Sequence, residues 1–294
     1  MITTLSYEEQ YYNILKEINE NGYCQKNERT GIATLRIPHA VIQVNLQKEF
    51  PILKCKEVFW KSALHEILWI MQKQSNNIHD LKPHIWDEWA DENGLIGKAY
   101  GYQVGKEITT RDKEHFNSQV HYVLETLAKD SSDRRCVINL WNVDELSEMN
   151  LVPCCFVSVW NIIDGKLNCL LTQRSADYLV GVPFNTTQYA MLTHLFARHL
   201  GVEPGQITHI MADCHIYSGL ASHYNGMREM ITRMDKIKKF MPTYMTDEDL
   251  ARISYTSPRF HINVNKTDFF SINPEDCNVE LYEHFPHIPF EVAV

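Results

Sequence analysis

One cysteine occupies a position typical of a catalytic nucleophile. Cys154 follows Pro153 and precedes a run of β-branched and aromatic residues, 155–163, which is typical of a β-strand. A positioned cysteine thiolate can add to an electrophilic carbon and form a covalent intermediate. We therefore take Cys154 as the candidate nucleophile of this chain.

A dense set of polar residues follows this cysteine. A turn signal after residue 163 leads to a second predicted strand over residues 166–172. Residues 173–177 then read Gln-Arg-Ser-Ala-Asp, and a core strand would not carry so many polar groups unless they faced a ligand. The segment 151–185 therefore predicts a binding site beside the cysteine, which the other elements must hold in place.

These other elements can be predicted from apolar periodicity and from capping residues. We expect helices over residues 6–22, 58–72, 114–129 and 186–200, and strands near 33–46, 206–213 and 259–264 and through residue 141. Asn185 is expected to be the N-cap of the helix over 186–200, and Gly201 its C-terminal stop. A helix over 84–93 would place Trp86 and Trp89 on one face.

Length and composition limit the class of protein. The 294 residues contain no Pro/Gly/Ser-rich linker and no charge run, which predicts a single domain over residues 1–294. The hydrophobic content of 44% and the charged content of 22% are typical of globular proteins. Without an apolar run of membrane-span length or a signal peptide, we expect a cytoplasmic location and no membrane partner.

The cysteines and the charge limit the kinds of ligand. We expect the eight cysteines to be thiols, and no C-x-x-C motif or His-Glu-x-x-His motif predicts a metal site. The net charge of −9 makes nucleic-acid binding unlikely, although a few arginines can still bind a small anion on an acidic protein. No G-x-G-x-x-G motif predicts a nicotinamide site.

Several residues permit two interpretations from the sequence alone. Glu66 in an apolar helix either pairs with a structural partner or takes part in proton transfer, and these two are evenly matched. The two tryptophans are most simply core residues, and Arg29 is most simply a solvated charge. We expect His194 and His199 to be structural.

Together these motifs resemble the thymidylate synthase family in order and spacing. The matching stretches are Glu28-Arg29-Thr30-Gly31, His65-Glu66, 85–93, Tyr100-Gly101, Arg134-Arg135, Pro153-Cys154, 173–177, 181–185, 213–217 and 292–294. They cover nearly the whole chain, and their joint occurrence is far more specific than any one of them. The resemblance implies an α+β fold with a large mixed, mostly antiparallel sheet flanked by helices, packed back to back in a homodimer.

The resemblance also implies the reaction, which is the reductive methylation of dUMP to dTMP by a methyltransferase. Addition of the Cys154 thiolate to C6 of uracil would make C5 nucleophilic. The co-substrate would be 5,10-methylenetetrahydrofolate, which serves as carbon donor and reductant and leaves as dihydrofolate. Such a reaction requires neither a metal nor a nicotinamide cofactor.

Individual roles follow from the resemblance. Beside Cys154, the catalytic residues would be Glu66 in a water network at the pyrimidine O4, Tyr100 at the C5 proton and Asp177 at the pterin ring. The dUMP ligands would be Arg29, Arg174, Ser175, Asn185, His215 and Tyr217, with Arg134 and Arg135 reaching the phosphate bound by the other subunit. The folate ligands would be Lys56 at the glutamate tail, Trp86, Asp177, Gly181 and the terminal Val294, which would close over the folate. Arg174 would also lower the pKa of the thiol.

The base specificity can be argued from hydrogen bonds. Uracil presents N3–H as a donor and O4 as an acceptor, and one amide side chain can match both. Asn185 is that amide. Cytosine presents the reverse pattern, and cytidylate hydroxymethylases carry Asp at the matching place, so Asn185 favours dUMP.

Three departures from the commonest family pattern stand out. Cys155 follows the nucleophile where His is usual, Val104-Gly105 replaces Trp-Arg, and the chain ends in Pro-Phe-Glu-Val-Ala-Val. A divergent bacterial and phage branch of the family has similar features, so the chain resembles that branch. We expect Cys155 to be inert packing rather than a second nucleophile.

Three alternatives remain open at this point. A dUMP hydroxymethylase would share the early steps and add water instead of hydride, and a non-catalytic homologue would only bind a nucleotide or RNA. A cysteine hydrolase would need a histidine paired with Cys154. Trp86 and the intact tail favour hydride transfer, and the joint presence of the candidate residues favours an active enzyme.

Overall fold

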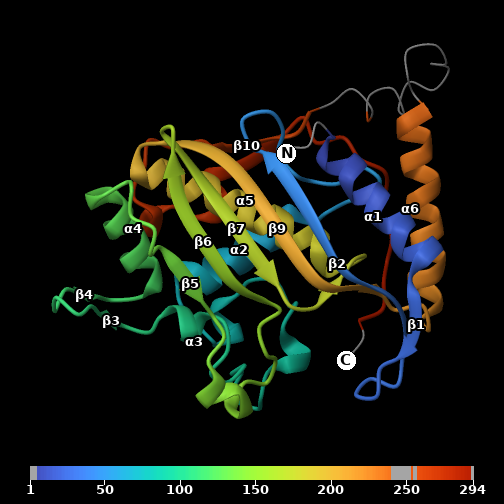
Figure 1. Ribbon diagram of the computed structural model, residues 1–294, viewed down its shortest axis with the longest axis horizontal. Helices are drawn as coiled ribbons and strands as arrows, with labels where there is room; N and C mark the ends of the chain where they lie inside the picture. Colours follow the sequence, from blue (N-terminus) through green and yellow to red (C-terminus); the bar gives the residue numbers. More distant parts are fainter. Residues whose placement is uncertain (1–4, 240–252, 254–256, 293–294) are drawn as a thin grey trace.

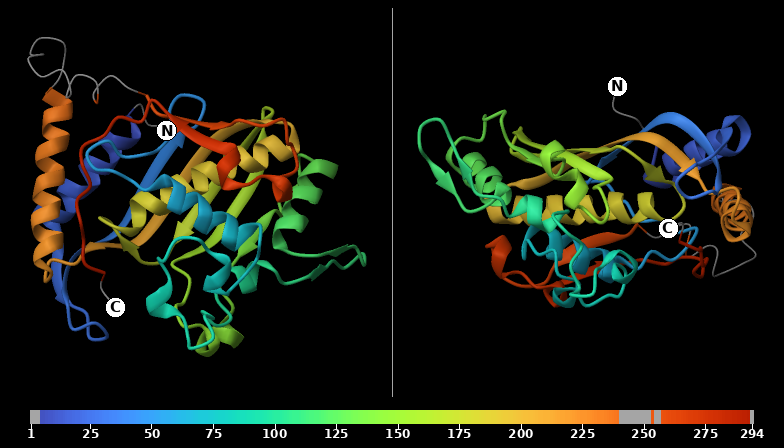
Figure 2. Two further views of the ribbon diagram at one scale, coloured as in Figure 1. Left: turned by 180° about the vertical axis from the view of Figure 1, so that it is seen from behind. Right: turned by 90° about the horizontal axis from the view of Figure 1, so that it is seen from below.

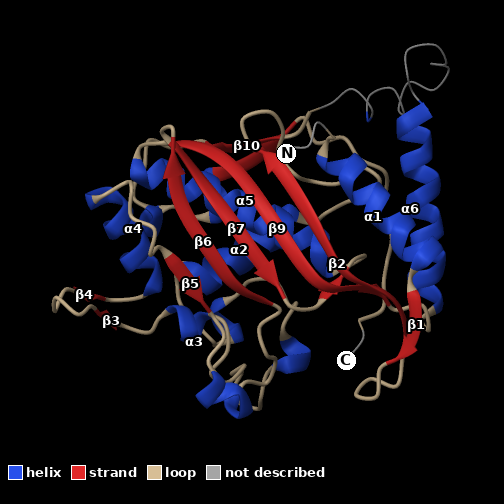
Figure 3. Cartoon of the chain, in the orientation of Figure 1, coloured by secondary structure: helices blue, strands red, loops and turns tan. Residues whose placement is uncertain are grey.

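The computed structural model describes residues 5–239, 253 and 257–292, and its centre is a seven-stranded sheet (Figures 1 and 3). The strand order is β1-β2-β9-β7-β6-β5, and the short β8 pairs with β9. The strands are β1 (Tyr23–Lys26), β2 (Ala33–Asn45), β5 (Val137–Asn139), β6 (Cys155–Ile163), β7 (Lys166–Gln173), β8 (Ala176–Asp177) and β9 (Glu203–Ile216).

The sheet is mixed and mostly antiparallel. Only the pairs β7 with β9 and β8 with β9 are parallel, and the other neighbours are antiparallel. Two further small sheets are formed by β3 (Ile108–Thr109) with β4 (His115–Phe116) and by β10 (Arg259–Ile262) with β11 (Cys277–Glu280). The fold class implied by the resemblance is confirmed for the single chain.

Two helices cover one face of the sheet. They are α2 (Trp60–Met71) and α5 (Gly181–Leu200), which lie behind the strands in Figure 1 and below them in the right view of Figure 2. Alternate residues of β7, such as Leu167, Cys169 and Leu171, are buried against them, as the two-residue period of a strand requires. The core therefore lies between this sheet face and the helices.

The remaining helices lie at the edges of the sheet. α1 (Tyr7–Asn21) and α6 (Ala221–Lys239) lie beside β1 and β2, and α4 (Gln119–Lys129) lies near β5 (Figure 1). Shorter helices are α3 (Gly101–Val104), η1 (Ile78–Asp80), η2 (Asp87–Trp89), η3 (Val143–Glu148), η4 (Phe269–Ser271) and η5 (Pro274–Asp276). Within the described ranges, no helix covers the front face of the sheet in Figure 1.

This open face carries apolar side chains. Val41 of β2 is 44% exposed, and it pairs in register with the half-buried Ile210 of β9. Leu170 of β7 and its register partner Val159 of β6 are half-buried on the same sheet. Apolar side chains left exposed on an uncovered sheet face are typical of a protein–protein interface.

Several local predictions are confirmed. The strand over 155–163 has the predicted bounds. The first helix begins with a complete capping box, in which Ser6 accepts from the Glu9 N–H and the Glu9 carboxylate accepts from the Ser6 N–H. Gly201 ends α5 with a φ of 67°, in the left-handed region that favours glycine.

Three local predictions are wrong. Asn185 is not an N-cap, because α5 begins at Gly181, and Pro183 is tolerated in the first turn, where its missing N–H has no helical acceptor. The predicted helix over 114–129 begins only at Gln119, with Ser118 as its N-cap. Residues 84–93 form only the single turn η2 instead of a helix.

Candidate active site

The candidate nucleophile lies where two paired strands end. Cys154 directly precedes β6, and Arg174 directly follows β7, the antiparallel neighbour of β6. The guanidinium of Arg174 lies 3.8 Å from the Cys154 Sγ and also donates to the carbonyl oxygens of Val152 at 2.7 Å and Pro153 at 3.0 Å. The sheet thus brings the two predicted groups together, and the backbone of the nucleophile segment fixes the arginine.

The charge of the thiol depends on two opposing effects. Burial raises the pKa of Cys154 above its ordinary value, and the positive charge of Arg174 opposes this rise. The charge of Arg174 therefore shifts the pKa of the thiol in the expected direction, but burial has the larger effect. In the free protein, burial therefore favours the neutral thiol over the thiolate.

Tyr100 contacts the same segment. Its hydroxyl oxygen accepts a hydrogen bond from the backbone N–H of Cys154 at 3.2 Å, and its ring lies edge-on to Trp86 with the centroids 4.9 Å apart. Burial raises the pKa of Tyr100 well above its usual value, so the hydroxyl stays protonated. Its backbone φ of 43° costs on the order of 1–3 kcal/mol, and such strain is concentrated at functional sites.

Glu66 of α2 is held by two donors. Its carboxylate accepts from the indole Nε1 of Trp86 at 2.9 Å and from Nε2 of Gln188 at 2.7 Å. Burial raises the pKa of Glu66 to about 7, even though both hydrogen bonds lower it. The carboxyl group therefore has structural partners and can also gain or lose a proton near neutral pH, so the two interpretations of its role are compatible.

The raised pKa of Glu66 predicts a pH-dependent cost in stability. Because the folded protein binds this proton more tightly than the unfolded chain, whose carboxyl has a pKa near 4.5, stability is lost as the pH rises from 4.5 to about 7. Glu66→Gln carries no such charge. The difference in free energy of unfolding between this variant and the natural protein should therefore change with pH. From about pH 4 to about pH 8 it should shift in favour of the variant by up to about 3 kcal/mol. Urea unfolding of both proteins at the two pH values measures this difference, and a constant difference would contradict the raised pKa.

Gln188 is a functional candidate that the sequence analysis missed. It lies one turn after Asn185 on α5, and it donates to Glu66 while its side-chain oxygen accepts from the Asn185 Nδ2 at 3.2 Å. It thereby connects the titratable carboxyl to the amide predicted to read the base. The available signal was the pair Asn185-x-x-Gln188, two amides on one face of a mostly buried helix.

Two predicted dUMP ligands and the residue predicted to bind the pterin gather where β8 meets β9. Asp177 of β8 pairs in register with His215 of β9, and the ring of Tyr217 lies 5.2 Å from that of His215. The Asp177 carboxylate accepts from the backbone N–H groups of Leu179 at 3.1 Å and Val180 at 3.2 Å, just before α5 begins. Ser175 is half-buried and lies in the chain between Arg174 and β8.

Other predicted residues are not brought together with Cys154 in the single chain. Arg134 and Arg135 are exposed after α4, and Arg135 is paired with the buried carboxylate of Asp133. Arg29 is exposed in the loop before β2, although its charge still lowers the pKa of the Cys154 thiol. Arginines that stay exposed in this way are available to an anion.

Of two predicted folate ligands, Lys56 and Val294, only Lys56 lies within the described residues. Lys56 is only 3% exposed, and its ammonium donates to the carbonyl oxygen of Leu179 at 2.6 Å and lies 4.8 Å from the ring of Phe290. Burial lowers the pKa of Lys56 to about 8. A contact with the glutamate tail of folate would require it to leave Leu179. Val294 lies outside the described residues.

The central residues line one small pocket. Among its lining residues are Glu66, Trp86, Tyr100, Cys154, Asn185 and Gln188. A larger cavity of about 550 Å³ lies between the start of α1 and α6, but its carboxylates Glu8 and Glu49 accept from backbone N–H groups of Cys55 at 2.8 Å and Tyr7 at 3.0 Å. The smaller pocket, with its thiol, is therefore the chemically equipped one.

The surroundings of the two adjacent cysteines bear on the alternatives. Among the described residues, the side chain that contacts the Cys154 thiol is Arg174, and no histidine is paired with it as a cysteine hydrolase requires. Cys155 is buried, and burial raises its pKa well above the usual value, so its thiol is unreactive.

Two other kinds of feature are absent from the described ranges. No three His, Cys, Asp or Glu side chains in these ranges come together as a metal ion would require. No helix in the same part of the chain is long and apolar enough to cross a membrane.

Comparisons with known proteins agree with this geometry. A family model described as thymidylate synthase matches residues 9–294. A thymidylate synthase of Clostridium beijerinckii is 39% identical over 98% of this chain and 99% of its own length. The structure of thermostable thymidylate synthase A from Bacillus subtilis covers 98% of this chain and 99% of its own, with 33% identity and a TM-score of 0.82. The chain therefore belongs to the thymidylate synthase family of methyltransferases.

Proposed function

We propose that this protein converts dUMP to dTMP with Cys154 as the covalent nucleophile. The observation that carries the proposal is the Cys154 thiol 3.8 Å from the Arg174 guanidinium, in one pocket with Tyr100 and Glu66. Arg174 would bind the phosphate of the nucleotide, and the pyrimidine would then lie against the thiol.

The first step would be addition of the thiolate to C6 of uracil. A C6–S bond forms, and the electron pair of the C5=C6 bond moves toward C5 and O4 to give an enolate with a nucleophilic C5. Negative charge develops on O4, where the carboxyl group of Glu66 would stabilise it through water. With a pKa of about 7, this carboxyl is partly protonated at neutral pH and can donate a hydrogen bond.

Asn185 would select the base. Its amide oxygen would accept from N3–H of uracil, and its Nδ2 would donate to O4. In the free protein this Nδ2 donates to Gln188, which in turn donates to Glu66. Gln188 would therefore orient the amide, because its own orientation is set by the carboxylate.

Removal of the C5 proton would involve Tyr100. The hydroxyl oxygen lies within hydrogen-bond range of the Cys154 backbone, close to where a pyrimidine bonded to Sγ would lie. Because its pKa is raised well above the usual value, the hydroxyl would act as a hydrogen-bonded relay for the proton and not as a free phenolate.

The residues around Gly181 would contact the ring of the folate. A Cβ at this position would lie 3.5 Å from Asn185 Oδ1 and 3.8 Å from the Asp177 Cβ, so Gly181 lies close to both the base-reading amide and a carboxylate. Asp177 would accept hydrogen bonds from the pterin, and Trp86 would provide an aromatic surface. When bound, 5,10-methylenetetrahydrofolate supplies the one-carbon group and the hydride.

The proposed site is completed by a second copy of the chain. The open apolar face over β2, β9, β7 and β6 would pack against the same face of the partner, as an isologous twofold interface does. Arg134 and Arg135 would then reach the phosphate in the partner's site, which agrees with their exposure in the single chain.

Mixing two inactive variants tests this arrangement. Cys154→Ala subunits keep both arginines, and subunits with Arg134→Ala and Arg135→Ala keep the nucleophile. After joint unfolding and refolding, half of the dimers should be mixed and hold one complete site, so about a quarter of the natural activity should return. A mixture as inactive as its parts would show that the arginines act within their own subunit.

The reaction itself is tested by product analysis. Purified protein with dUMP and 5,10-methylenetetrahydrofolate should form dihydrofolate together with dTMP, identified by the mass of the nucleotide. Tetrahydrofolate together with 5-hydroxymethyl-dUMP would instead identify a hydroxymethylase. An absence of turnover with retained dUMP binding would favour a non-catalytic homologue.

Two organisational features belong to the same proposal. We infer that residues 1–294 form a single thymidylate synthase domain, because the central sheet joins strands from β1 to β9 and its core includes α1 and α6. The protein would work in the cytoplasm, on small-molecule substrates and without a metal or nicotinamide.

A further inference from the structure

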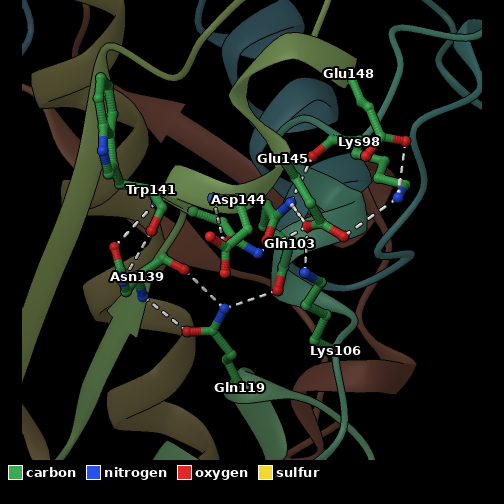
Figure 4. A network of polar contacts seen from close by, with 10 residues as sticks. Lys98, Gln103, Lys106, Gln119, Asn139, Trp141, Asp144, Glu145 and Glu148 are labelled. Atoms are coloured by element: carbon green, nitrogen blue, oxygen red, sulfur yellow. Dashed lines mark hydrogen bonds and ion pairs between the residues drawn. The ribbon is translucent and has the colours of Figure 1, made fainter.

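A network of polar side chains has Glu145 of η3 at its centre (Figure 4). The Glu145 carboxylate accepts from Nε2 of Gln103 at 2.8 Å and from Nδ2 of Asn142 at 2.8 Å. It also forms ion pairs with Lys106 and, at 3.4 Å, with Lys98. These partners hold the pKa of Glu145 at about 2, so the carboxylate is charged at every physiological pH.

Through Gln103 this network reaches the helix that follows Tyr100. Gln103 is a buried residue of α3, and its Nε2 also donates to the backbone oxygen of Lys98 at 2.7 Å. α3 is only four residues long, so its own backbone hydrogen bonds cannot fix its position. Side-chain contacts from outside, including those of Glu145, must therefore hold it.

On its opposite flank α3 packs tightly against the chain after α2. A Cβ at Gly101 would lie 2.0 Å from the backbone oxygen of Ser75, so only glycine allows this approach. Tyr100, which precedes Gly101, has the strained φ of 43°. A strained residue keeps its conformation only when its surroundings over-determine it.

A second branch of the network reaches Arg174. Nε2 of Gln119 donates to the backbone oxygens of Gln103 at 2.7 Å and Asn139 at 2.8 Å. The side chain of Asn139 bonds both backbone groups of Trp141, whose ring lies 5.6 Å from the Arg174 guanidinium. Figure 4 shows this chain of contacts from Gln103 to Trp141.

We propose that Glu145 is a positioning residue that holds α3, and through it the hydroxyl of Tyr100, at the proton-transfer position. This inference rests on the proposed function, in which Tyr100 relays the C5 proton. Two residues that depart from the common family pattern lie here: Val104 is fully buried and Gly105 lies against Gln74, and the residue that follows them, Lys106, forms an ion pair with Glu145.

The expected effect of Glu145→Ala is on the rate of proton transfer. A misplacement of about 1 Å can cost about 10²-fold in rate, so kcat should fall about 10- to 100-fold while KM for dUMP changes less than about threefold. The deuterium isotope effect on kcat with C5-deuterated dUMP should rise, because proton removal becomes more rate-limiting. Glu145→Gln, which keeps an oxygen acceptor for Gln103, should lose less.

Glu148 provides a matched control. It lies on the same turn η3 and forms an ion pair with Lys98 at 2.8 Å, but it makes no described contact with Gln103. Glu148→Ala should leave kcat and the isotope effect within about twofold of the natural protein. An equal loss in this control would overturn the proposal, because the effect would then come from η3 in general.

A double-mutant cycle with Tyr100→Phe separates positioning from general damage. If Glu145 acts through the Tyr100 hydroxyl, Glu145→Ala should change kcat by less than about twofold once that hydroxyl is removed. Fully additive losses would overturn the proposal. Glu145→Gln replaces the alanine variant in the cycle if thermal unfolding shows that alanine destabilises the fold.

The outcome also distinguishes this inference from the proposed function. Loss of the C5 hydrogen during turnover by the natural protein is required by the function and does not depend on Glu145. If the natural protein forms no dTMP and releases no C5 hydrogen, the function fails. If it does both but the cycle is additive, only the role of Glu145 fails.

Discussion

Replacing Cys154 with alanine should lower the rate of dTMP formation by about 10⁴-fold or more, because no covalent route to a nucleophilic C5 remains. Binding of dUMP should change far less, since the arginines and the amide of Asn185 are retained. Steady-state formation of dihydrofolate measures the loss, and equilibrium binding of dUMP measures what is kept. Full turnover by this variant would refute the covalent mechanism.

Cys155 provides the matched control. Its thiol is adjacent in sequence but buried, and burial raises its pKa well above the usual value. Cys155→Ala should therefore keep turnover within a few-fold of the natural protein and cost roughly 1 kcal/mol of stability from lost packing. Comparable inactivation by both substitutions would mean that the segment, and not the Cys154 sulfur, limits the rate.

Replacing Asn185 with aspartate should change the preferred base. A carboxylate cannot donate to O4 of uracil, so the kcat/KM for dUMP should fall about 10²- to 10³-fold. Cytosine has an amino group at C4, which can donate a hydrogen bond to the carboxylate of the new aspartate. We therefore expect dCMP to become a substrate. Mass analysis of the products from each nucleotide measures the switch.

Asn185→Ala is the control for this switch. It removes both hydrogen bonds to uracil and offers none to cytosine, so dUMP turnover should fall without a gain for dCMP. A gain for dCMP in the alanine variant as well would mean that Asn185 excludes cytosine by size. In that case the hydrogen-bond argument for the base would be wrong.

The parts of the fold that could be predicted from the sequence are those set by local interactions. β6 has its predicted bounds because a β-branched and aromatic run there ends at a turn signal. The first helix is set by the capping box of Ser6 and Glu9. The difference at Asn185 is also local: Asn is a good N-cap, but Pro183 is equally compatible with a first turn, so the helix begins earlier, at Gly181.

The rest depends on contacts between distant residues. Glu66 and Gln188 are 122 residues apart in the chain, and Lys56 donates to a carbonyl oxygen 123 residues away. In both pairs, the sequence around one residue gives no indication of which distant residue it will contact. The proposed contact of Arg134 with the other subunit would likewise depend on residues of a second chain, which no pattern around Arg134 specifies.

In the candidate site, too, some features are set by local sequence and others by contacts between distant residues. The neighbourhood of Cys154 and Arg174 was implied by the family resemblance, and it has a local basis, because the two residues lie at the ends of adjacent strands that pair in a hairpin. The direction of the net pKa shift of the Cys154 thiol could not be predicted from the sequence. It depends on how completely the surrounding chain buries the thiol, because burial raises the pKa.

The most direct test of the account is the intact mass of the protein after incubation with 5-fluoro-dUMP and 5,10-methylenetetrahydrofolate. Fluorine cannot leave C5 as a cation, so a reaction that begins with thiolate addition should stop as a covalent complex. We expect a mass increase equal to the nucleotide plus the folate, located on the peptide with Cys154 and absent in Cys154→Ala. An unchanged mass in a protein that still forms dTMP would contradict covalent catalysis by Cys154.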